Sequence, residues 1–194
     1  AVVINGRDLT VEEVIRVCRQ NEKVEIAPEA KKAVQKARDY IEKKLEDGAV
    51  IYGLTTGFGK FSNVLISKEE TAELQKNLIM SHTCTMGEPY PRQYVRAAML
   101  LRCNALSRGN SGIRLSTVQT LIDMLNAGIH PVIPRKGSLG APGDLAPLSH
   151  IALGLIGMGK VEYKGKTVDA KEAMSEAGIV PVELAAKEGL ALNN

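Results

Sequence analysis

Apolar runs bounded by glycine, proline and capping residues divide most of the chain into segments of helical length. Thr10 and Glu13 have the spacing of a capping box, in which each side chain satisfies a backbone N–H at the start of a helix. Ser67 and Glu70 repeat this spacing farther along the chain. Together with the proline and glycine positions, these signals predict helices over residues 11–20, 28–46, 68–80, 91–107 and 112–127.

Proline and glycine mark the limits of these helices. Pro28 and Pro91 suit first-turn positions, because proline has no backbone N–H to leave unsatisfied there. Gly48 and Gly128 suit the positions just after a helix, where the backbone often turns to positive φ. The apolar segment 145–158 predicts another helix, directly after a stretch rich in glycine and proline.

Two short β-hairpins are predicted between the helices. Asn5-Gly6 suits a type I′ turn, so residues 2–9 form the first hairpin. Lys164-Gly165 lies near the turn of the second, which covers residues 160–168.

The predicted fold class is therefore mainly α with two small β-hairpins. Asp169 and Glu172 have capping spacing and predict one further short helix after the second hairpin. The sequence contains no internal repeat and no low-complexity linker, so we place no domain boundary within residues 1–194.

Composition narrows the classes of protein that fit this pattern. The 194 residues are 44% hydrophobic, which suffices for a buried core, and their net charge of +3 comes from interspersed basic and acidic residues. Because the charges are interspersed, the chain lacks the basic patch of a nucleic-acid-binding protein, and with 4% aromatic residues it also lacks a stacking surface. Apolar runs such as 151–156 are too short to cross a membrane, and residues 1–4 lack the basic flank of a signal peptide. We expect a soluble, cytoplasmic protein.

Cysteine and histidine give weak signals for chemistry. Cys18, Cys84 and Cys103 are odd in number and widely spaced, which fits a reducing compartment and predicts neither a disulfide framework nor a metal pair. The three histidines, His82, His130 and His150, are also far apart in the sequence, so no metal site is predicted. Proximity of Cys84 to His82 is only a weak indication of a thiol nucleophile. His150 suits a hydrogen-bonded core position.

The glycine-rich segment 51–60 fails the spacing of both a phosphate loop and a dinucleotide fingerprint, so a structural loop is favoured there. From the residues alone, the chain is a mainly helical protein with two glycine-rich loops, at 51–60 and 137–144.

Taken together, several segments resemble the histidine and aromatic amino-acid ammonia-lyase family over essentially the whole chain. The motifs are Tyr52-Gly53, Thr56-Gly57-Phe58-Gly59, Asn77-Leu78-Ile79-Met80-Ser81-His82, Leu101-Arg102, Ser111-Gly112, Pro131-Val132-Ile133-Pro134, Gly137-Ser138-Leu139-Gly140, Gly143-Asp144-Leu145-Ala146-Pro147-Leu148-Ser149-His150 and Lys187-Glu188-Gly189-Leu190-Ala191-Leu192. The resemblance implies that residues 1–194 are the N-terminal part of the family's helical fold, without its C-terminal helical part, and that the intact protein is a homotetramer.

In that family an Ala-Ser-Gly triad cyclises to the electrophilic prosthetic group methylidene-imidazolone. The matching positions here are Ala141, Pro142 and Gly143, so proline replaces the serine. Proline has no hydroxyl to eliminate, and its ring already occupies the backbone nitrogen that would join the new heterocycle. The group is therefore predicted to be absent from a chain with Pro142. Asp144 matches the acid that follows the family's triad.

The resemblance also implies roles for four residues outside the triad. Tyr52 occupies the position of the proton-abstracting base, a phenol whose usual pKa near 10 would need lowering at neutral pH. Ser81 and His82 lie where the family selects its substrate side chain, and this pair is typical of histidine-specific members. Asn194 matches the asparagine that helps to hold the substrate and prosthetic group.

The implied reaction of the intact enzyme is elimination of ammonia from L-histidine to give urocanate, with this chain inactive as written. Two alternatives stay open: a non-catalytic fragment or relative that only folds or assembles, and a phenylalanine or tyrosine ammonia-lyase or aminomutase. The chain's end suggests a truncated protein, so we expect helix 112–127 to expose an apolar face that lacks a partner in this chain.

Overall fold

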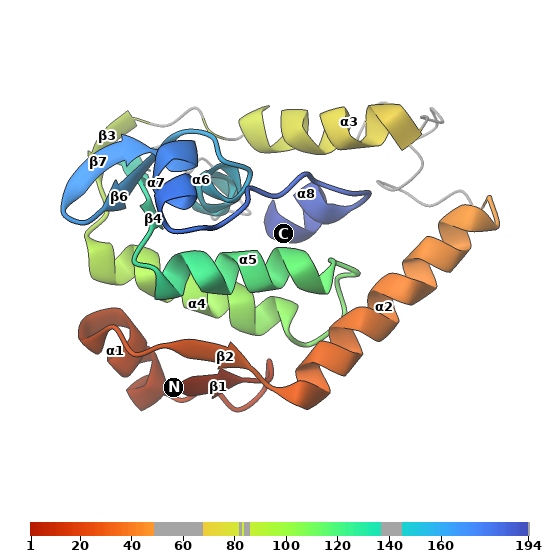
Figure 1. The fold of residues 1–194 in the computed structure, drawn as a ribbon, viewed down its shortest axis with the longest axis horizontal. Coiled ribbons are helices and arrows are strands. Elements are labelled where there is room, and N and C mark those ends of the chain that lie inside the picture. The colour runs from red at the N-terminus through yellow and green to blue at the C-terminus, as the bar shows by residue number, and fades with distance from the viewer. Residues whose placement is uncertain (49–67, 82, 84–85, 137–144, 194) are drawn as a thin grey trace.

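The computed structural model describes residues 1–48, 68–81, 83, 86–136 and 145–193 (Figure 1). Its elements, in chain order, are β1 (Val2–Ile4), α1 (Val11–Gln20), β2 (Val24–Ile26), α2 (Pro28–Glu46), α3 (Lys68–Ser81), β3 (Met86–Pro89), α4 (Arg92–Leu106), α5 (Leu115–Asn126), β4 (His130–Pro131), β5 (Pro134–Lys136), α6 (Leu145–Leu155), β6 (Lys160–Tyr163), β7 (Lys166–Asp169), α7 (Ala170–Glu176) and α8 (Glu188–Asn193).

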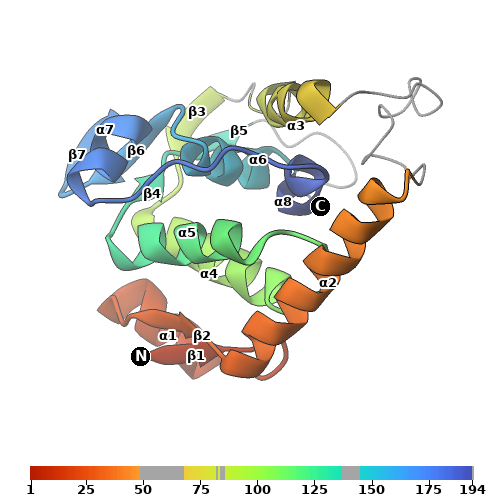
Figure 2. The same cartoon turned by 45° about the vertical axis from the view of Figure 1, so that its right-hand side comes forward.

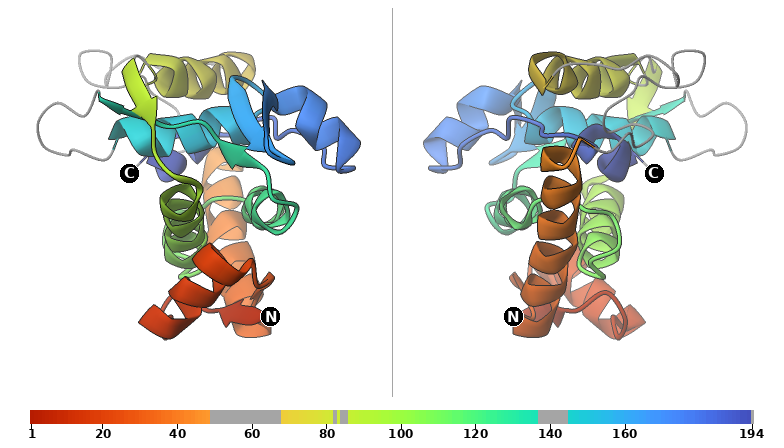
Figure 3. Two further views of the ribbon diagram at one scale, coloured as in Figure 1. Left: turned by 90° about the vertical axis from the view of Figure 1, so that its left-hand side faces the viewer. Right: turned by 90° about the vertical axis from the view of Figure 1, so that its right-hand side faces the viewer.

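The elements form three tiers. Figure 1 shows α1 with β1 and β2 at the bottom, α4 and α5 in the middle, and α3, α6 and α8 at the top beside the small sheet of β4, β6 and β7. Helix α2 runs across the ends of α4 and α5 (Figure 3). Figures 1 and 2 both place α8 between α3 and α5.

The predicted helical character is confirmed, and local signals fixed several helix limits well. The Thr10 hydroxyl accepts a hydrogen bond from the Glu13 N–H (3.2 Å), and the Glu13 carboxylate accepts one from the Thr10 N–H (3.1 Å), which completes the capping box of α1. Helix α2 begins at Pro28 as predicted. Gly48, with φ of +74°, follows its end. The predicted capping residue Ser67 lies outside the described residues.

Other helix limits were predicted less well. Pro91 is the N-cap of α4 rather than a first-turn residue. Helix α5 begins at Leu115 instead of 112, because Gly112 takes a φ of +74° that the helix cannot include. Helix α6 ends at Leu155, shortly before Gly157 at φ +80°.

The predicted N-terminal hairpin is wrong. β1 pairs with β2 in parallel, in the register Val2↔Val24, and α1 is the connection between the two strands. The Asn5 side chain accepts hydrogen bonds from the N–H groups of Arg7 (2.8 Å) and Asp8 (3.0 Å). This local turn directs the chain into α1, so residues 7–9 do not return along β1.

The second hairpin is confirmed. β6 and β7 are antiparallel, and Lys164 and Gly165 between them have φ of 51° and 76°, as a type I′ turn requires. The predicted side-chain cap of α7 is wrong, however. Asp169 precedes α7, but its carboxylate accepts a hydrogen bond from the Lys160 ammonium (2.6 Å) across the hairpin instead.

The core extends through all three tiers. Helix α5 buries all its apolar residues except Leu115, which is partly buried and packs against the core, so the expectation of an unpartnered face over 112–127 is wrong. Its neighbour α4 instead exposes Tyr94 and Leu101, at 59% and 52%. Among the described residues, no helix combines the length and apolar character needed to cross a membrane.

Candidate functional site

The structure describes one of the eight candidate site residues, Ser81. The others lie outside the described residues: Tyr52, His82, Ala141, Pro142, Gly143, Asp144 and Asn194. Ser81 is the last residue of α3 and is exposed, and its hydroxyl donates a hydrogen bond to the Leu78 carbonyl (2.8 Å). Thr83 donates to the Met80 carbonyl in the same way (2.8 Å). The end of α3 is therefore capped by its own hydroxyl side chains.

The helices that carry or border the candidate residues pack together. Helix α3 ends at Ser81, α6 begins directly after residues 137–144, and α8 ends one residue before Asn194. Each of these three helices contacts the other two. Sequence segments about a hundred residues apart thus meet in one cluster, which is the candidate site region.

Helix α8 lies unusually close to α3. The Gly189 N–H donates a hydrogen bond to the side-chain carbonyl of Gln75 (2.7 Å), which is fully buried. A Cβ atom at Gly189 would lie 2.8 Å from the Gln75 backbone oxygen. Only glycine permits this approach, so the small residue of the 187–192 motif has a packing reason.

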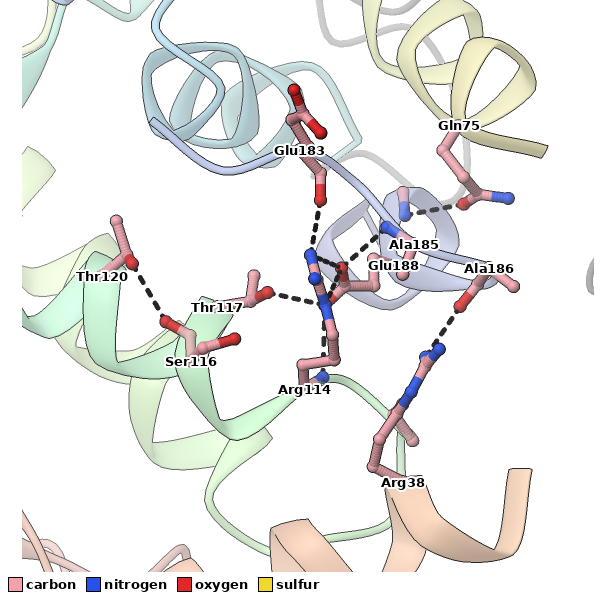
Figure 4. A network of polar contacts seen from close by, with 12 residues as sticks. Arg38, Gln75, Arg114, Ser116, Thr117, Thr120, Glu183, Ala185, Ala186 and Glu188 are labelled. Carbon is pink, nitrogen blue, oxygen red and sulfur yellow. Dashed lines mark hydrogen bonds and ion pairs between the residues drawn. The ribbon is translucent and has the colours of Figure 1, made fainter. Parts of the chain in front are cut away.

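Glu188, the first residue of α8, is the centre of a buried polar network (Figure 4). One carboxylate oxygen accepts hydrogen bonds from the Arg114 Nε (2.8 Å) and the Ala185 N–H (2.8 Å), and the Arg114 Nη2 lies 2.7 Å away. The other oxygen accepts from the Thr117 hydroxyl (2.7 Å) and the Arg114 N–H (3.2 Å). Arg114 also donates to the Glu183 carbonyl. The buried charge is therefore paired and fully hydrogen-bonded.

Arg38 joins α2 to the same region. Its Nη1 donates hydrogen bonds to the carbonyls of Ala186 (3.0 Å) and Gly112 (3.2 Å), and its Nε pairs with Glu42 one helical turn away (2.9 Å). The guanidinium is buried although it belongs to a strongly charged helix. It fixes the segment just before α8 against the turn just before α5.

A second buried network lies at the other end of α5, near Leu125. Arg96 donates hydrogen bonds to the carbonyls of Val17 and Leu125 (2.9 Å each), and its Nη1 lies 2.9 Å from Nε2 of His130. Burial, followed by the Arg96 charge, lowers the pKa of His130 to about 3. His130 is therefore neutral at physiological pH, and its Nε2 accepts a hydrogen bond from the Arg96 guanidinium. This arrangement suits a structural role rather than proton transfer.

Burial also lowers the pKa of His150, which is half-buried in α6. Within the part of the chain that the structure describes, no three histidine, cysteine, aspartate or glutamate side chains are grouped to hold a metal ion.

Sequence reasoning missed the ionic residues that organise this region. Glu188 belongs to a motif that carried the resemblance, but it received no role, and Arg114 stands two residues after another such motif. Both are charged residues that the fold buries or half-buries at helix starts. Arg96 was missed because a single arginine in a helical pattern gives no sign of its burial. The available signal was its position beside Val95 and Met99, on the buried face of α4.

Known proteins with similar sequences belong to one family. Residues 9–194 match the model of the family described as aromatic amino acid lyase. Histidine ammonia-lyases of Caldanaerobacter subterraneus and Alkaliphilus metalliredigens are 54% and 55% identical over 193 residues, which are 100% of this chain and 38% of each relative. The chain thus spans well under half the length of the curated relatives it matches.

Solved structures agree with this fold. A Pantoea agglomerans phenylalanine aminomutase shares 40% identity at a TM-score of 0.93, covering 100% of this chain and 37% of that one. The histidine ammonia-lyase of Trypanosoma cruzi also shares 40% identity, at a TM-score of 0.91 and with the same coverage.

Proposed function

The chain belongs to the aromatic amino acid lyase family, and we propose that residues 1–194 are the N-terminal part of a histidine ammonia-lyase-like protein. The observation that carries the proposal is the identity of 54–55% with histidine ammonia-lyases along the whole chain. The packing of α3, α6 and α8 into one cluster supports the proposal, because those helices carry or border the candidate residues.

The proposed reaction, for a full-length protein with serine at position 142, is elimination of ammonia from L-histidine to give urocanate. We further propose that the full-length protein is a cytoplasmic homotetramer, as the family resemblance implies. Tyr52 is the proposed base, Ser81 and His82 face the substrate side chain, and Asn194 helps to hold the substrate.

The prosthetic group implied by the family does not fit the residues present. Formation of methylidene-imidazolone needs a hydroxyl on the central residue of the triad and a nitrogen free to join the ring. Pro142 has no hydroxyl, and its side chain is already bonded to that nitrogen. We therefore propose that a protein with Pro142 does not eliminate ammonia, and that lyase activity requires serine at this position. Pro142 is also the observation that favours the second candidate function, a non-catalytic relative.

Turnover by the full-length protein tests the proposal. The Pro142 protein and its Pro142→Ser variant are each given L-histidine or L-phenylalanine, and urocanate or cinnamate is followed by ultraviolet absorbance. We expect urocanate from the serine variant only, with histidine preferred. Pro142→Ala, which also lacks a hydroxyl, is the matched control and is expected to be inactive. A serine variant that is folded but turns over neither substrate would contradict the lyase proposal and favour the non-catalytic one.

His82 has a separate test within the active variant. We expect His82→Leu to lower turnover of histidine relative to phenylalanine, because the imidazole of the substrate loses its polar neighbour. Unchanged relative turnover would remove His82 from substrate selection and leave it as a residue that follows the end of α3.

A further inference from the structure

Helix α8 is too short to hold its own position. It has six residues, well below the length at which isolated helices become stable in water. The chain enters it from segment 179–187, which contains neither helix nor strand. Its orientation must therefore come from contacts with neighbouring elements.

Glu188 supplies the strongest of these contacts. Its carboxylate accepts four hydrogen bonds, from the backbone N–H and Nε of Arg114, the hydroxyl of Thr117 and the backbone N–H of Ala185, and it forms an ion-pair contact with the Arg114 Nη2. The bond to Ala185 closes the start of α8, as a glutamate three residues into a capping box does. The bonds to Arg114 and Thr117 connect that start to the first turn of α5.

The partner helix is a rigid support. Helix α5 lies in the core, with Thr117 and Val118 almost completely buried. Arg114 contributes two of the four hydrogen bonds and the ion-pair contact, and its planar guanidinium fixes the direction of the carboxylate as well as its distance. Lysine at this position would keep the charge but lose that geometry.

We propose that Glu188 and Arg114 form a positioning pair that orients α8, the helix that Asn194 follows directly in the sequence. This inference rests on the proposed function, because Asn194 has a substrate to hold only if the protein is a lyase. Neither member of the pair contacts substrate; both act through α8. Other polar contacts of the region come from Gln75, Arg38 and Arg102. They hold Gly189, Ala186 and Ala191 and leave the Glu188 carboxylate to its own donors.

Amide hydrogen exchange of the full-length Pro142 protein tests the pair without requiring activity. Arg114→Lys and Glu188→Gln are expected to raise exchange in residues 185–193 by at least about tenfold, while α7 exchanges as before. Thr117→Val removes one hydrogen-bond donor with little change in side-chain shape, so we expect a smaller rise in exchange over residues 185–193. This variant replaces the other two in the test if they fail to fold. Glu176→Gln, which removes an exposed ion pair with Lys164, is the matched control and should change nothing in residues 185–193.

Unchanged exchange in residues 185–193 would overturn the inference. Faster exchange spread equally over all helices would overturn it too, because it would show general destabilisation instead of a local pair.

Kinetics of the Pro142→Ser protein test the link to Asn194. Added Arg114→Lys is expected to lower kcat/KM for histidine about 10²-fold per folded enzyme, as misplacement of a positioning group by about 1 Å can. Arg96→Lys is the control, since it disturbs a buried arginine that does not contact α8 and should leave kcat/KM of folded enzyme unchanged. Equal kcat/KM in the Arg114→Lys protein would overturn the inference. If Pro142→Ser itself has no activity, the proposed function fails, and exchange still decides whether the pair orients α8.

Discussion

Replacement of Arg96 by methionine removes one of the largest buried polar groups of the fold. Arg96 is 2% exposed, and its charge has no acidic partner among the described residues. It donates instead to carbonyls in the last turns of α1 and α5, where the helix dipole favours a cation. Methionine fills much of the volume but donates no hydrogen bond, so we expect Arg96→Met to destabilise the protein.

The magnitude follows from the acceptors that lose their donor. The Val17 carbonyl has no substitute within α1, because the Asn21 N–H bonds to Arg16 instead. Nε2 of His130 also loses its donor, whereas the Leu125 carbonyl keeps the Gly128 N–H (3.2 Å). Two buried acceptors at about 1–3 kcal/mol each, partly offset by removal of a buried charge, give a loss of about 2–4 kcal/mol.

Urea denaturation followed by circular dichroism measures this loss. A change of about 3 kcal/mol shifts the midpoint by roughly 1–3 M urea. Arg92→Met on the same helix is the matched control, because Arg92 is exposed and makes one side-chain bond, to Asn21 (2.6 Å). We expect the control to cost less than about 1 kcal/mol. Equal small losses for both variants would refute the reasoning, since the cost of burying Arg96 would then cancel its hydrogen bonds.

Two further predictions concern stability. His130 has a folded-state pKa of about 3, below its ordinary 6.5, so its contribution to the free energy of unfolding is complete above pH 6.5 and is lost as the pH falls toward 3. His130→Gln should therefore reduce the loss of unfolding free energy between pH 7 and pH 5 by about 2 kcal/mol. An unchanged dependence of this free energy on pH, measured by urea titrations, would contradict the prediction. Gly109→Ala should lower the stability in thermal unfolding by over about 1 kcal/mol more than Gly48→Ala. Both glycines have positive φ, but only at Gly109 would a Cβ lie 2.7 Å from the backbone of Ala33. Equal losses of stability would show that backbone strain outweighs the contact.

The predicted features that the structure confirmed are those with local causes. The limits of α1 follow from a capping box whose two members are three residues apart, and the start of α2 follows from Pro28. The β6–β7 hairpin follows from Lys164-Gly165 for the same reason, since two residues with positive φ define its turn.

Features that depend on distant partners were missed. Asn5-Gly6 is compatible with a hairpin, but the strand that pairs with β1 lies beyond α1, and no local pattern identifies it. Asp169 has good capping spacing, yet a lysine across the hairpin takes its carboxylate.

The candidate site shows the same division. The motifs that carried the resemblance predicted candidate residues, but the pairing of Arg114 with Glu188 joins positions 74 residues apart. Local sequence carries no information about such a contact, which arises only when α5 and α8 pack. Burial of the two charges then makes the pairing necessary, because an unpaired carboxylate at that depth would cost several kcal/mol.

Intact-mass spectrometry of the full-length protein tests the central claim most directly, namely that this lyase-family chain lacks its prosthetic group because of Pro142. Cyclisation and dehydration of an Ala-Ser-Gly triad removes two water molecules. The Pro142 protein is expected to have the mass of its unmodified sequence, and the Pro142→Ser protein to lack two waters within residues 137–148 after proteolysis. A deficit of two waters in the Pro142 protein, or none in the serine variant, would contradict the account.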